Sequence, residues 1–248
     1  MRIAVAGATG RIGRLTVAAL ERAGHQTVPI SRRAGVDAYT GTGLDAALAG
    51  VEAVIDSTNT SSRNQAEIVD FFGTTTRNLL AAGARAGVRH HVLLSIVGID
   101  HGQPVGHYAG KREQERLVTG GPVPWSIVRA TQFHDFAATV IGWTERDGVA
   151  TIAPLLVQPI APADVAAVLA ETAAGPPLHA KLDVAGPETQ DLVDMARRTL
   201  AVRGQDITLI PTWRGPFGVH MAGEVLLPGE GARLTPTTFA DWLAAGAP

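Results

Sequence analysis

Three glycines at positions 7, 10 and 13 follow directly behind a short apolar run, residues 1–6. This order predicts a buried strand that turns through glycines into a helix. Without Cβ atoms, backbone N–H groups can approach a phosphate closely, and the helix N-terminus adds donors and partial positive charge. We therefore expect the turn to bind the pyrophosphate of a dinucleotide. The predicted binding residues in the turn are Gly7, Thr9, Gly10, Arg11, Ile12 and Gly13.

The segment behind the turn supports this interpretation. Ile12, Leu15 and Ala19 fall on one face of a helix, and Gly24 is placed to end it. Residues 25–30 then indicate a second strand. A strand, a glycine turn, a helix and a second strand within about thirty residues are what a dinucleotide-binding unit requires.

The end of the second predicted strand indicates which dinucleotide is bound. An NAD site places an acid there to accept a hydrogen bond from the ribose 2′-hydroxyl. This chain has Ser31, Arg32 and Arg33 instead, and its next acid is Asp37. Guanidinium groups grip a 2′-phosphate bidentately, whereas a carboxylate repels it. We therefore predict NADP(H) as the cofactor, and Arg11 could reach the same phosphate.

Several segments in this order resemble an atypical short-chain dehydrogenase/reductase of the NmrA-like, NAD(P)H-binding group. The resemblance covers roughly residues 1–170 and implies an NAD(P)-binding Rossmann-type fold. Its matching segments are residues 7–13, 53–56, 92–98, 107–113, 124–133 and 158–166.

The resemblance also implies a Ser/Tyr/Lys catalytic set, in which the lysine holds the nicotinamide ribose and the tyrosine exchanges a proton. Lys111 matches the lysine and Ser95 matches the serine. The tyrosine position, four residues before the lysine, is occupied by His107, and Tyr108 is adjacent. Three alternatives stay open: His107 donates the proton, Tyr108 substitutes for it, or no side chain supplies one.

Other positions are expected to line the cofactor or the substrate. Ser57 and Thr58 follow the predicted strand 51–56 and should contact the cofactor. The predicted substrate residues are Thr131, Phe133, Phe217 and Met221. No histidine or acid spacing is typical of a metal site, so we expect no metal.

The elements that must position these residues alternate along the chain. Apolar strands and helices predict an α/β fold with a doubly wound parallel sheet covered on both faces. Short strands are also predicted at residues 36–40 and 158–161. The chain of 248 residues is expected to form a single NAD(P)-binding domain, with residues from about 150 to 248 contributing a small substrate lobe.

Composition limits the function further. Charged residues make up 18%, the formal net charge is −2 and there is no cysteine. These values argue against nucleic-acid binding, disulfides and thiolate chemistry. The chain shows neither an apolar run long enough for a bilayer nor a signal peptide, so we expect a cytoplasmic protein. We expect a monomer or homodimer with a small-molecule substrate.

These observations favour an NADP(H)-dependent oxidoreductase acting on a small apolar carbonyl, quinone or enone. Two alternatives remain. One is a non-catalytic NADP(H)-sensing regulatory protein, which the displaced tyrosine supports. The other is a non-redox isomerase or cyclase that uses His107 as a base.

Overall fold

The computed structural model describes residues 1–101 and 106–246. The chain divides into two compact units. Unit 1 comprises Met1–Arg129 and Pro162–Leu182, and unit 2 comprises Ala130–Ala161 and Asp183–Pro248. The units therefore interleave along the sequence, whereas the predicted lobe was one continuous C-terminal stretch.

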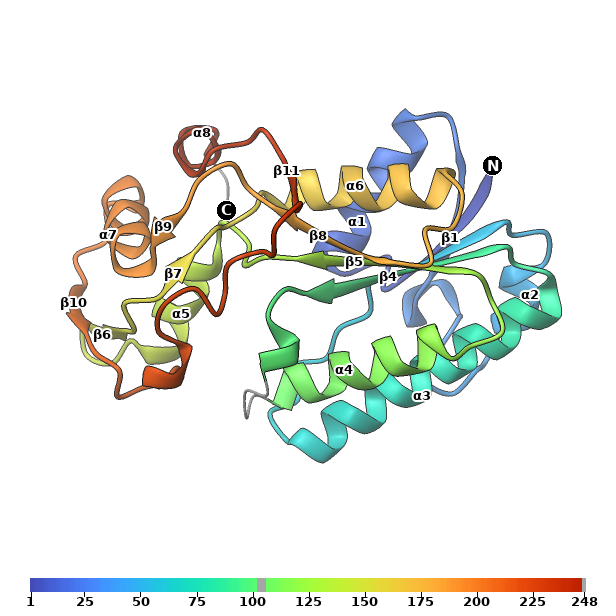
Figure 1. Cartoon of the computed structure of the whole chain (residues 1–248), viewed down its shortest axis with the longest axis horizontal. Helices are drawn as coiled ribbons and strands as arrows, with labels where there is room; N and C mark the ends of the chain where they lie inside the picture. Colours follow the sequence, from blue (N-terminus) through green and yellow to red (C-terminus); the bar gives the residue numbers. More distant parts are fainter. Residues whose placement is uncertain (102–105, 247–248) are drawn as a thin grey trace. The chain divides into compact units, whose positions relative to one another are not determined.

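Most strands of the parallel sheet belong to unit 1, and this sheet confirms the predicted fold class (Figure 1). The strand order is β11-β8-β5-β4-β3-β1-β2. Ala6 at the end of β1 pairs with Ile30 on β2 and with Asp56 on β3, so these three strands end together. The order reverses between β1 and β3, and ligands of such sheets bind at this point. The strands are β1 (Arg2–Ala6), β2 (Gln26–Ile30), β3 (Ala53–Asp56), β4 (His90–Ile96), β5 (Trp125–Ala130), β8 (Lys181–Ala185) and β11 (Arg233–Leu234).

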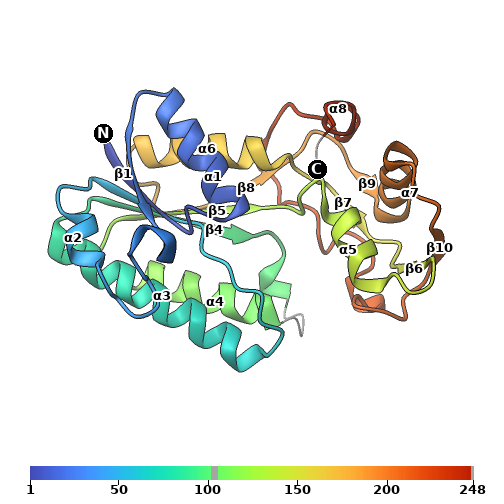
Figure 2. The same cartoon turned by 180° about the vertical axis from the view of Figure 1, so that it is seen from behind.

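Helices cover both faces of this sheet (Figures 1 and 2). On one face α1 (Arg11–Arg22) packs against α6 (Pro162–Ala174). On the other, α3 (Gln65–Ala86) packs against α2 (Leu44–Leu48) and α4 (Gly106–Thr119). Burial of the central strands on both faces explains their continuous apolar sequences, as in β1 and β3.

The strand predicted at residues 36–40 is wrong. After β2 the chain forms a short 3₁₀ helix, η1 (Arg32–Ala34), followed by turns. Asp37 Oδ1 accepts hydrogen bonds from the backbone N–H groups of Tyr39 and Thr40, at 2.9 and 3.5 Å. This side-chain turn competes with sheet pairing, and the sequence Gly41-Thr42-Gly43 bends the chain further with both glycines at positive φ.

Unit 2 has its own hydrophobic core, which includes Met195 and Phe239, both at most 1% exposed. The strand predicted at 158–161 is also wrong, because β7 ends at Val157 and only Ile160 forms a bridge, with Phe133. The helices of unit 2 are α5 (Phe136–Thr144), α7 (Leu192–Arg203) and α8 (Phe239–Ala244), with a short 3₁₀ helix η3 (Val219–Met221). Its short separate sheets pair β6 (Val149–Ile152) with β10 (Thr208–Pro211), and β7 (Leu156–Val157) with β9 (Gln190–Asp191).

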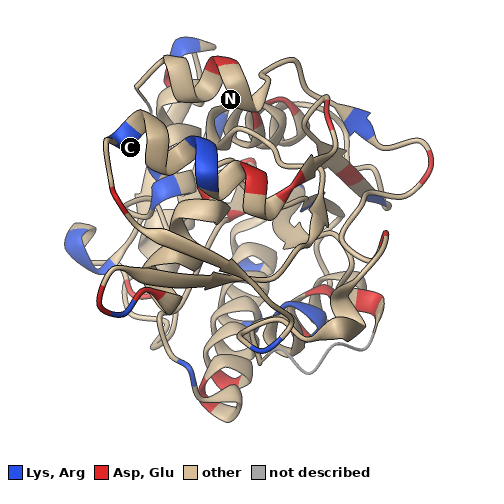
Figure 3. Cartoon of the chain, turned by 90° about the vertical axis from the view of Figure 1, so that its left-hand side faces the viewer, with Lys and Arg blue, Asp and Glu red and all other residues tan. Residues whose placement is uncertain are grey.

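Charged residues of both signs are interspersed along the chain in Figure 3, in keeping with the net charge of −2. In the part of the chain that the structure describes, no helix is long and apolar enough to cross a membrane.

Candidate functional site

The glycine turn connects β1 to α1 and depends on three glycines in different ways. Gly7 has φ +77°, and a Cβ there would lie 2.8 Å from the Ser57 carbonyl oxygen. A Cβ on Gly13 would lie 2.1 Å from the Gly7 carbonyl oxygen, so α1 packs directly on the turn. Gly10 has an ordinary extended backbone and only one tight neighbour, Gly7 O at 3.1 Å. Gly7 and Gly13 therefore maintain the turn, while Gly10 keeps its pocket side open.

The N-terminus of α1 is prepared for an anion. Gly10 is the N-cap, so no side chain caps the helix, and its first turn carries no acid. The first amides of an α-helix have no partner within the helix and can bind an anion. Arg14 Nη1 donates to the Thr9 carbonyl oxygen at 2.8 Å and fixes the turn. Burial lowers the pKa of Arg11. This arrangement fits a pyrophosphate group.

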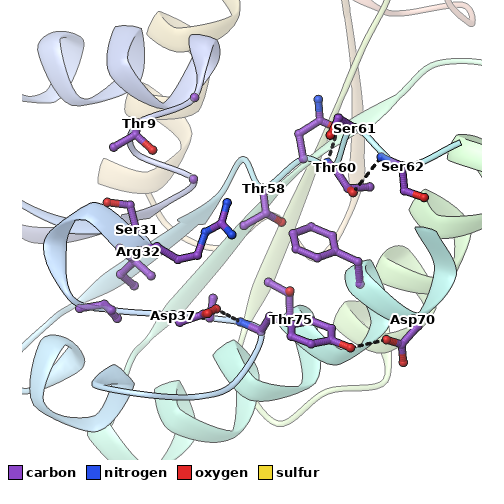
Figure 4. A pocket seen from close by; sticks show the side chains of 18 of the residues that line it. Thr9, Ser31, Arg32, Asp37, Thr58, Thr60, Ser61, Ser62, Asp70 and Thr75 are labelled. Carbon is purple, nitrogen blue, oxygen red and sulfur yellow. Dashed lines mark hydrogen bonds between the residues drawn. The ribbon is translucent and has the colours of Figure 1, made fainter. Parts of the chain in front are cut away.

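A pocket of about 630 Å³ opens at the ends of β1, β2 and β3, entirely within unit 1 (Figure 4). Of the predicted cofactor residues, Gly7, Thr9, Gly10, Ser31, Arg32 and Thr58 line it. The remaining lining residues come from the end of β2, the turn after η1, the loop after β3 and α3. They are Ile30, Val36, Asp37, Ala38, Tyr39, Asn59, Thr60, Ser61, Ser62, Glu67, Asp70, Phe71 and Thr75.

The two neighbouring arginines after β2 have different surroundings. Arg32 lines the pocket, and Figure 4 shows its side chain reaching toward Thr58. Arg33 is exposed and lies outside the described lining of this pocket. Ser31 Oγ accepts a hydrogen bond from the backbone N–H of Ala34 at 3.3 Å and so caps η1. Asp37 lines the same pocket as Arg32.

The loop after β3 is held by a buried carboxylate. Asp56 is fully buried, and its Oδ1 accepts from the backbone N–H and the hydroxyl of Thr58, at 3.0 and 2.6 Å. Ser57 turns the other way and donates its hydroxyl to the Ala6 carbonyl oxygen at 2.8 Å. Thr58 lines the pocket with its hydroxyl held by Asp56, and Ser57 ties β3 to β1.

Ser95 belongs to an ionic cluster centred on the buried Glu115 and Arg129. Its hydroxyl donates to Glu115 Oε1 at 2.6 Å, and the residue is 2% exposed. Arg129 bridges Glu115 and Asp100 at 2.6 Å each, and Lys181 Nζ lies 2.9 Å from Glu115 Oε2. Burial alone would raise the pKa of Glu115, but hydrogen bonds from Arg129, Ser95 and Lys181 lower it.

Lys111 points into the interior of unit 1. Its Nζ donates to the Leu94 carbonyl oxygen at 2.9 Å and lies 4.6 Å from the centre of the Phe72 ring. Burial lowers the pKa of Lys111 to about 8, against the opposing effect of the negative charges of Asp56 and Glu115.

His107 and Lys111 share a face of α4, as their spacing predicts. The His107 ring meets Phe72 edge-on, with ring centres 5.2 Å apart. Burial, with a smaller contribution from the Lys111 charge, lowers the pKa of His107 to about 4. The imidazole is therefore neutral near pH 7. Tyr108 is half-buried on the same helix.

The four predicted substrate residues all belong to unit 2. The Thr131 hydroxyl donates to the Gln158 carbonyl oxygen at 2.6 Å. Phe133 forms the bridge with Ile160. Phe217 contacts the rings of Phe136 and Trp143, with centres 5.6 and 6.4 Å away. Met221 is 1% exposed within the core of unit 2.

Sequence reasoning missed most of the far wall of the pocket. Glu67, Asp70, Phe71 and Thr75 recur at helical spacing on one face of α3, and that periodicity was an available signal. Residues 36–39 were not predicted to line the pocket, because a strand was wrongly predicted there. Among the described residues, no group of three or more histidines and acids could hold a metal ion.

The glycine turn, the uncapped helix and the pocket at the switch point define a dinucleotide-binding α/β protein. A family model described as NAD(P)H-binding matches residues 7–176, more than half of the sequence. The chain belongs to this NAD(P)H-binding family, which confirms the predicted family. No curated protein matches the sequence.

Solved structures of the same fold have low sequence identity. A short-chain dehydrogenase/reductase superfamily protein from Agrobacterium tumefaciens with bound NAD is 18% identical, with TM-score 0.72, over 99% of this chain and 95% of that one. An NADPH-dependent quinone oxidoreductase from Escherichia coli, complexed with NADPH, is 18% identical, with TM-score 0.71, over 98% of this chain and 99% of that one. A triphenylmethane reductase from Citrobacter sp., complexed with NADP(H), is 18% identical, with TM-score 0.67, over 86% of this chain and 79% of that one.

Proposed function

We propose that this protein is an NADP(H)-dependent reductase that acts on a quinone or another small conjugated acceptor. The observation that carries the proposal is the pocket in unit 1, in which Gly10 and the open N-terminus of α1 stand beside Arg32. Two structural neighbours, a quinone oxidoreductase and a triphenylmethane reductase, support the reductase class and the kind of acceptor. An NADPH-consumption screen against quinones and enones tests it, and absence of turnover on all of them would overturn it.

Arg32 is the residue that we propose selects the 2′-phosphate. It is the arginine of the predicted pair that lines the pocket, and its guanidinium can form charged hydrogen bonds with a phosphate. Thr9, Gly10 and the first amides of α1 would hold the pyrophosphate, and Thr58 would contact the cofactor from the β3 side.

Arg32→Ala should weaken NADPH binding by about 1.5–3 kcal/mol, because charged hydrogen bonds to the 2′-phosphate are lost. NADH, which lacks this phosphate, should bind nearly as before. Titration of both dinucleotides by calorimetry measures the difference. The matched control is Arg33→Ala, which removes the same charge outside the pocket and should leave both affinities nearly unchanged. Equal wild-type affinities for NADPH and NADH would contradict the assignment.

The surroundings of the predicted catalytic set favour an acceptor that needs no proton from the protein. Ser95 is committed to Glu115, and His107 is neutral near pH 7. Neither is poised as an acid for a ketone. When bound, NADPH would supply a hydride, which carries two electrons and one proton. The second proton needed to form the quinol would come from water.

Lys111 retains a proposed role in cofactor binding. An ammonium group has three N–H donors, and the Leu94 carbonyl uses one of them. The others would serve the ribose contact that the family resemblance implies. Thr131, Phe133, Phe217 and Met221 stay the proposed substrate residues. Met221, inside the core of unit 2, would act by shaping that core.

His107→Phe and Tyr108→Phe should each change turnover on a benzoquinone by less than about threefold, whereas loss of a general acid costs about 10²–10⁴-fold. Because the pKa of His107 lies near 4, its charge should not alter the rate between about pH 6 and pH 8. Steady-state rates across this range measure both effects. A loss above about 100-fold in one variant, with unchanged NADPH affinity, would assign the proton to that residue.

The hydrogen bond of Ser95 to Glu115 also favours a second candidate function, a non-catalytic NADP(H)-sensing protein. In that case NADPH binds with the same selectivity and no acceptor is reduced. The low pKa of His107 makes it a weak base, which disfavours the isomerase alternative. The consumption screen separates the reductase from the sensor.

A further inference from the structure

Two neighbouring strands of the sheet, β5 and β8, lead the chain from unit 1 into unit 2. Unit 1 ends at Arg129 on β5 and at Leu182 on β8, and the residues that follow on both strands belong to unit 2. The remaining passage, between Ala161 and Pro162, lies directly before α6. Because β5 and β8 are adjacent in the strand order (Figure 1), they form a two-stranded connection, which we call the β5–β8 ribbon.

Backbone hydrogen bonds join the two strands of the ribbon on both sides of the passage. In unit 1 the Ile127 N–H donates to the Ala180 carbonyl oxygen at 3.1 Å. In unit 2 the Thr131 N–H donates to the Val184 carbonyl oxygen at 3.0 Å. These bonds keep the strands in register, so a group that holds both strands at the passage also fixes Thr131.

Glu115 of α4 is such a group. Its two carboxylate oxygens accept from Arg129 Nε and Nη2, at 2.8 and 2.6 Å, in a bidentate pair. Lys181 Nζ lies 2.9 Å from Glu115 Oε2. Arg129 is the last residue of unit 1 on β5, and Lys181 is the last but one on β8. One carboxylate therefore bridges the two strands just before they leave unit 1.

The burial of Glu115 makes this bridge more than a surface ion pair. The Glu115 side chain is 5% exposed and that of Arg129 is 10% exposed, so water screens their interaction little. Ser95 on β4 donates to Glu115 Oε1 at 2.6 Å and fixes the carboxylate from a third strand. Burial would raise the pKa of Glu115, but the hydrogen bonds from these partners lower it, so the group stays charged at neutral pH.

We propose that Glu115 is a positioning residue that clamps the β5–β8 ribbon and thereby fixes the segment after β5, which carries Thr131 and Phe133. This inference rests on the proposed function, in which Thr131 and Phe133 are substrate residues. Arg129 stands two residues before Thr131, so a hold on its side chain limits the movement of that segment. The described lining of the dinucleotide pocket runs from Gly7 to Thr75 and does not include the clamp. Acceptor binding should therefore depend on Glu115, and dinucleotide binding should not.

Glu115→Gln tests the clamp, because glutamine keeps the shape of the side chain and removes its charge. We expect the ribbon amides of Ile127 and Thr131 to exchange hydrogen about tenfold faster than in the wild type. The Gly7 amide, which donates to the Ile30 carbonyl oxygen at 3.1 Å, should exchange as before. Hydrogen exchange followed by NMR measures these amides, and the comparison separates a loosened ribbon from a general loss of stability.

The kinetic signature of the clamp is a change in KM for the acceptor. In Glu115→Gln the KM for a benzoquinone should rise about fivefold, while kcat and NADPH affinity change by less than about twofold. The matched control is Glu113→Gln. Glu113 is a neighbouring acid on α4 that pairs with Arg116 of the same helix at 2.8 Å, and its loss should leave both the exchange rates and KM unchanged.

Lys181→Met is the second variant and keeps the test valid if Glu115→Gln fails to fold. Its side chain is 40% exposed, so its loss should be tolerated and should produce the same selective changes at smaller size. Unchanged exchange of the ribbon amides, or equal acceleration at Gly7, would overturn the clamp. Faster ribbon exchange with an unchanged KM would overturn its effect on the acceptor. If the wild type reduces no quinone, the proposed function fails, and the exchange rates alone then decide whether Glu115 clamps the ribbon.

Discussion

Gly10→Val is expected to weaken NADPH binding by more than about 100-fold while the protein stays folded. Gly10 lines the pocket, so a branched side chain would occupy the space of the pyrophosphate and screen the first amides of α1. The backbone at this position, with φ −71° and ψ 172°, is accessible to valine. The one tight contact of a new Cβ is Gly7 O at 3.1 Å, which a small shift relieves. Calorimetric titration measures the affinity, and circular dichroism measures the fold.

Gly13→Val provides the contrast. Its Cβ would lie 2.1 Å from the Gly7 carbonyl oxygen, and the facing atoms are backbone that cannot rotate away. We expect this variant to lose the first strand–helix unit and to fold poorly. A folded Gly10→Val protein that binds NADPH normally would show that the turn is not the phosphate site.

The glycine turn could be predicted from sequence because its function depends on backbone geometry. Gly7 and Gly13 are required wherever a helix packs this closely on a strand end, so residue type alone identifies the positions. The end of β2 was predictable for a similar reason, since Arg32 follows the strand directly. Periodic apolar residues also located most helices and the central strands, as in α1 and β3.

The far wall of the pocket could not be predicted in the same way. Residues 36–40 have strand-like composition, but the hydrogen bonds that Asp37 Oδ1 accepts from backbone N–H groups and the contact of Tyr39 with Asp70 produce a turn. The Tyr39–Asp70 contact joins positions 31 residues apart. A local pattern does not contain it, so a tertiary contact contributes to overriding propensity here.

The contacts around the predicted catalytic residues could likewise not be predicted from the sequence. Ser95 stands where the family resemblance places a serine, yet its hydroxyl is taken by Glu115 from α4. Glu115 in turn is held by Arg129 from β5 and Lys181 from β8. Nothing in the residue types of α4 indicates which of its acids turns inward.

Lys111 should make the stability of the protein depend on pH in the alkaline range. Burial lowers its pKa from 10.5 to about 8. Below about pH 8 the lysine is charged in both the folded and the unfolded states, and above about pH 10.5 it is neutral in both. Between these values the unfolded chain binds more protons, so the free energy of unfolding should rise with pH.

The expected rise from this one group is about 3 kcal/mol, the free energy that corresponds to a pKa lowered from 10.5 to about 8. Urea denaturation of the wild type and of Lys111→Met at about pH 7.5 and pH 10.5 measures it, because the difference between the two proteins isolates Lys111 from other titrating groups. Arg112→Met is the matched control. Arg112 is the next residue on α4 and donates to the Ile99 carbonyl oxygen at 2.7 Å, but a guanidinium stays charged throughout this range. The difference in the free energy of unfolding between Arg112→Met and the wild type should not change with pH. If the free-energy difference between Lys111→Met and the wild type is equally independent of pH, Lys111 is hydrated in solution. Its ammonium group is then accessible to the ribose of a bound dinucleotide without first leaving Leu94.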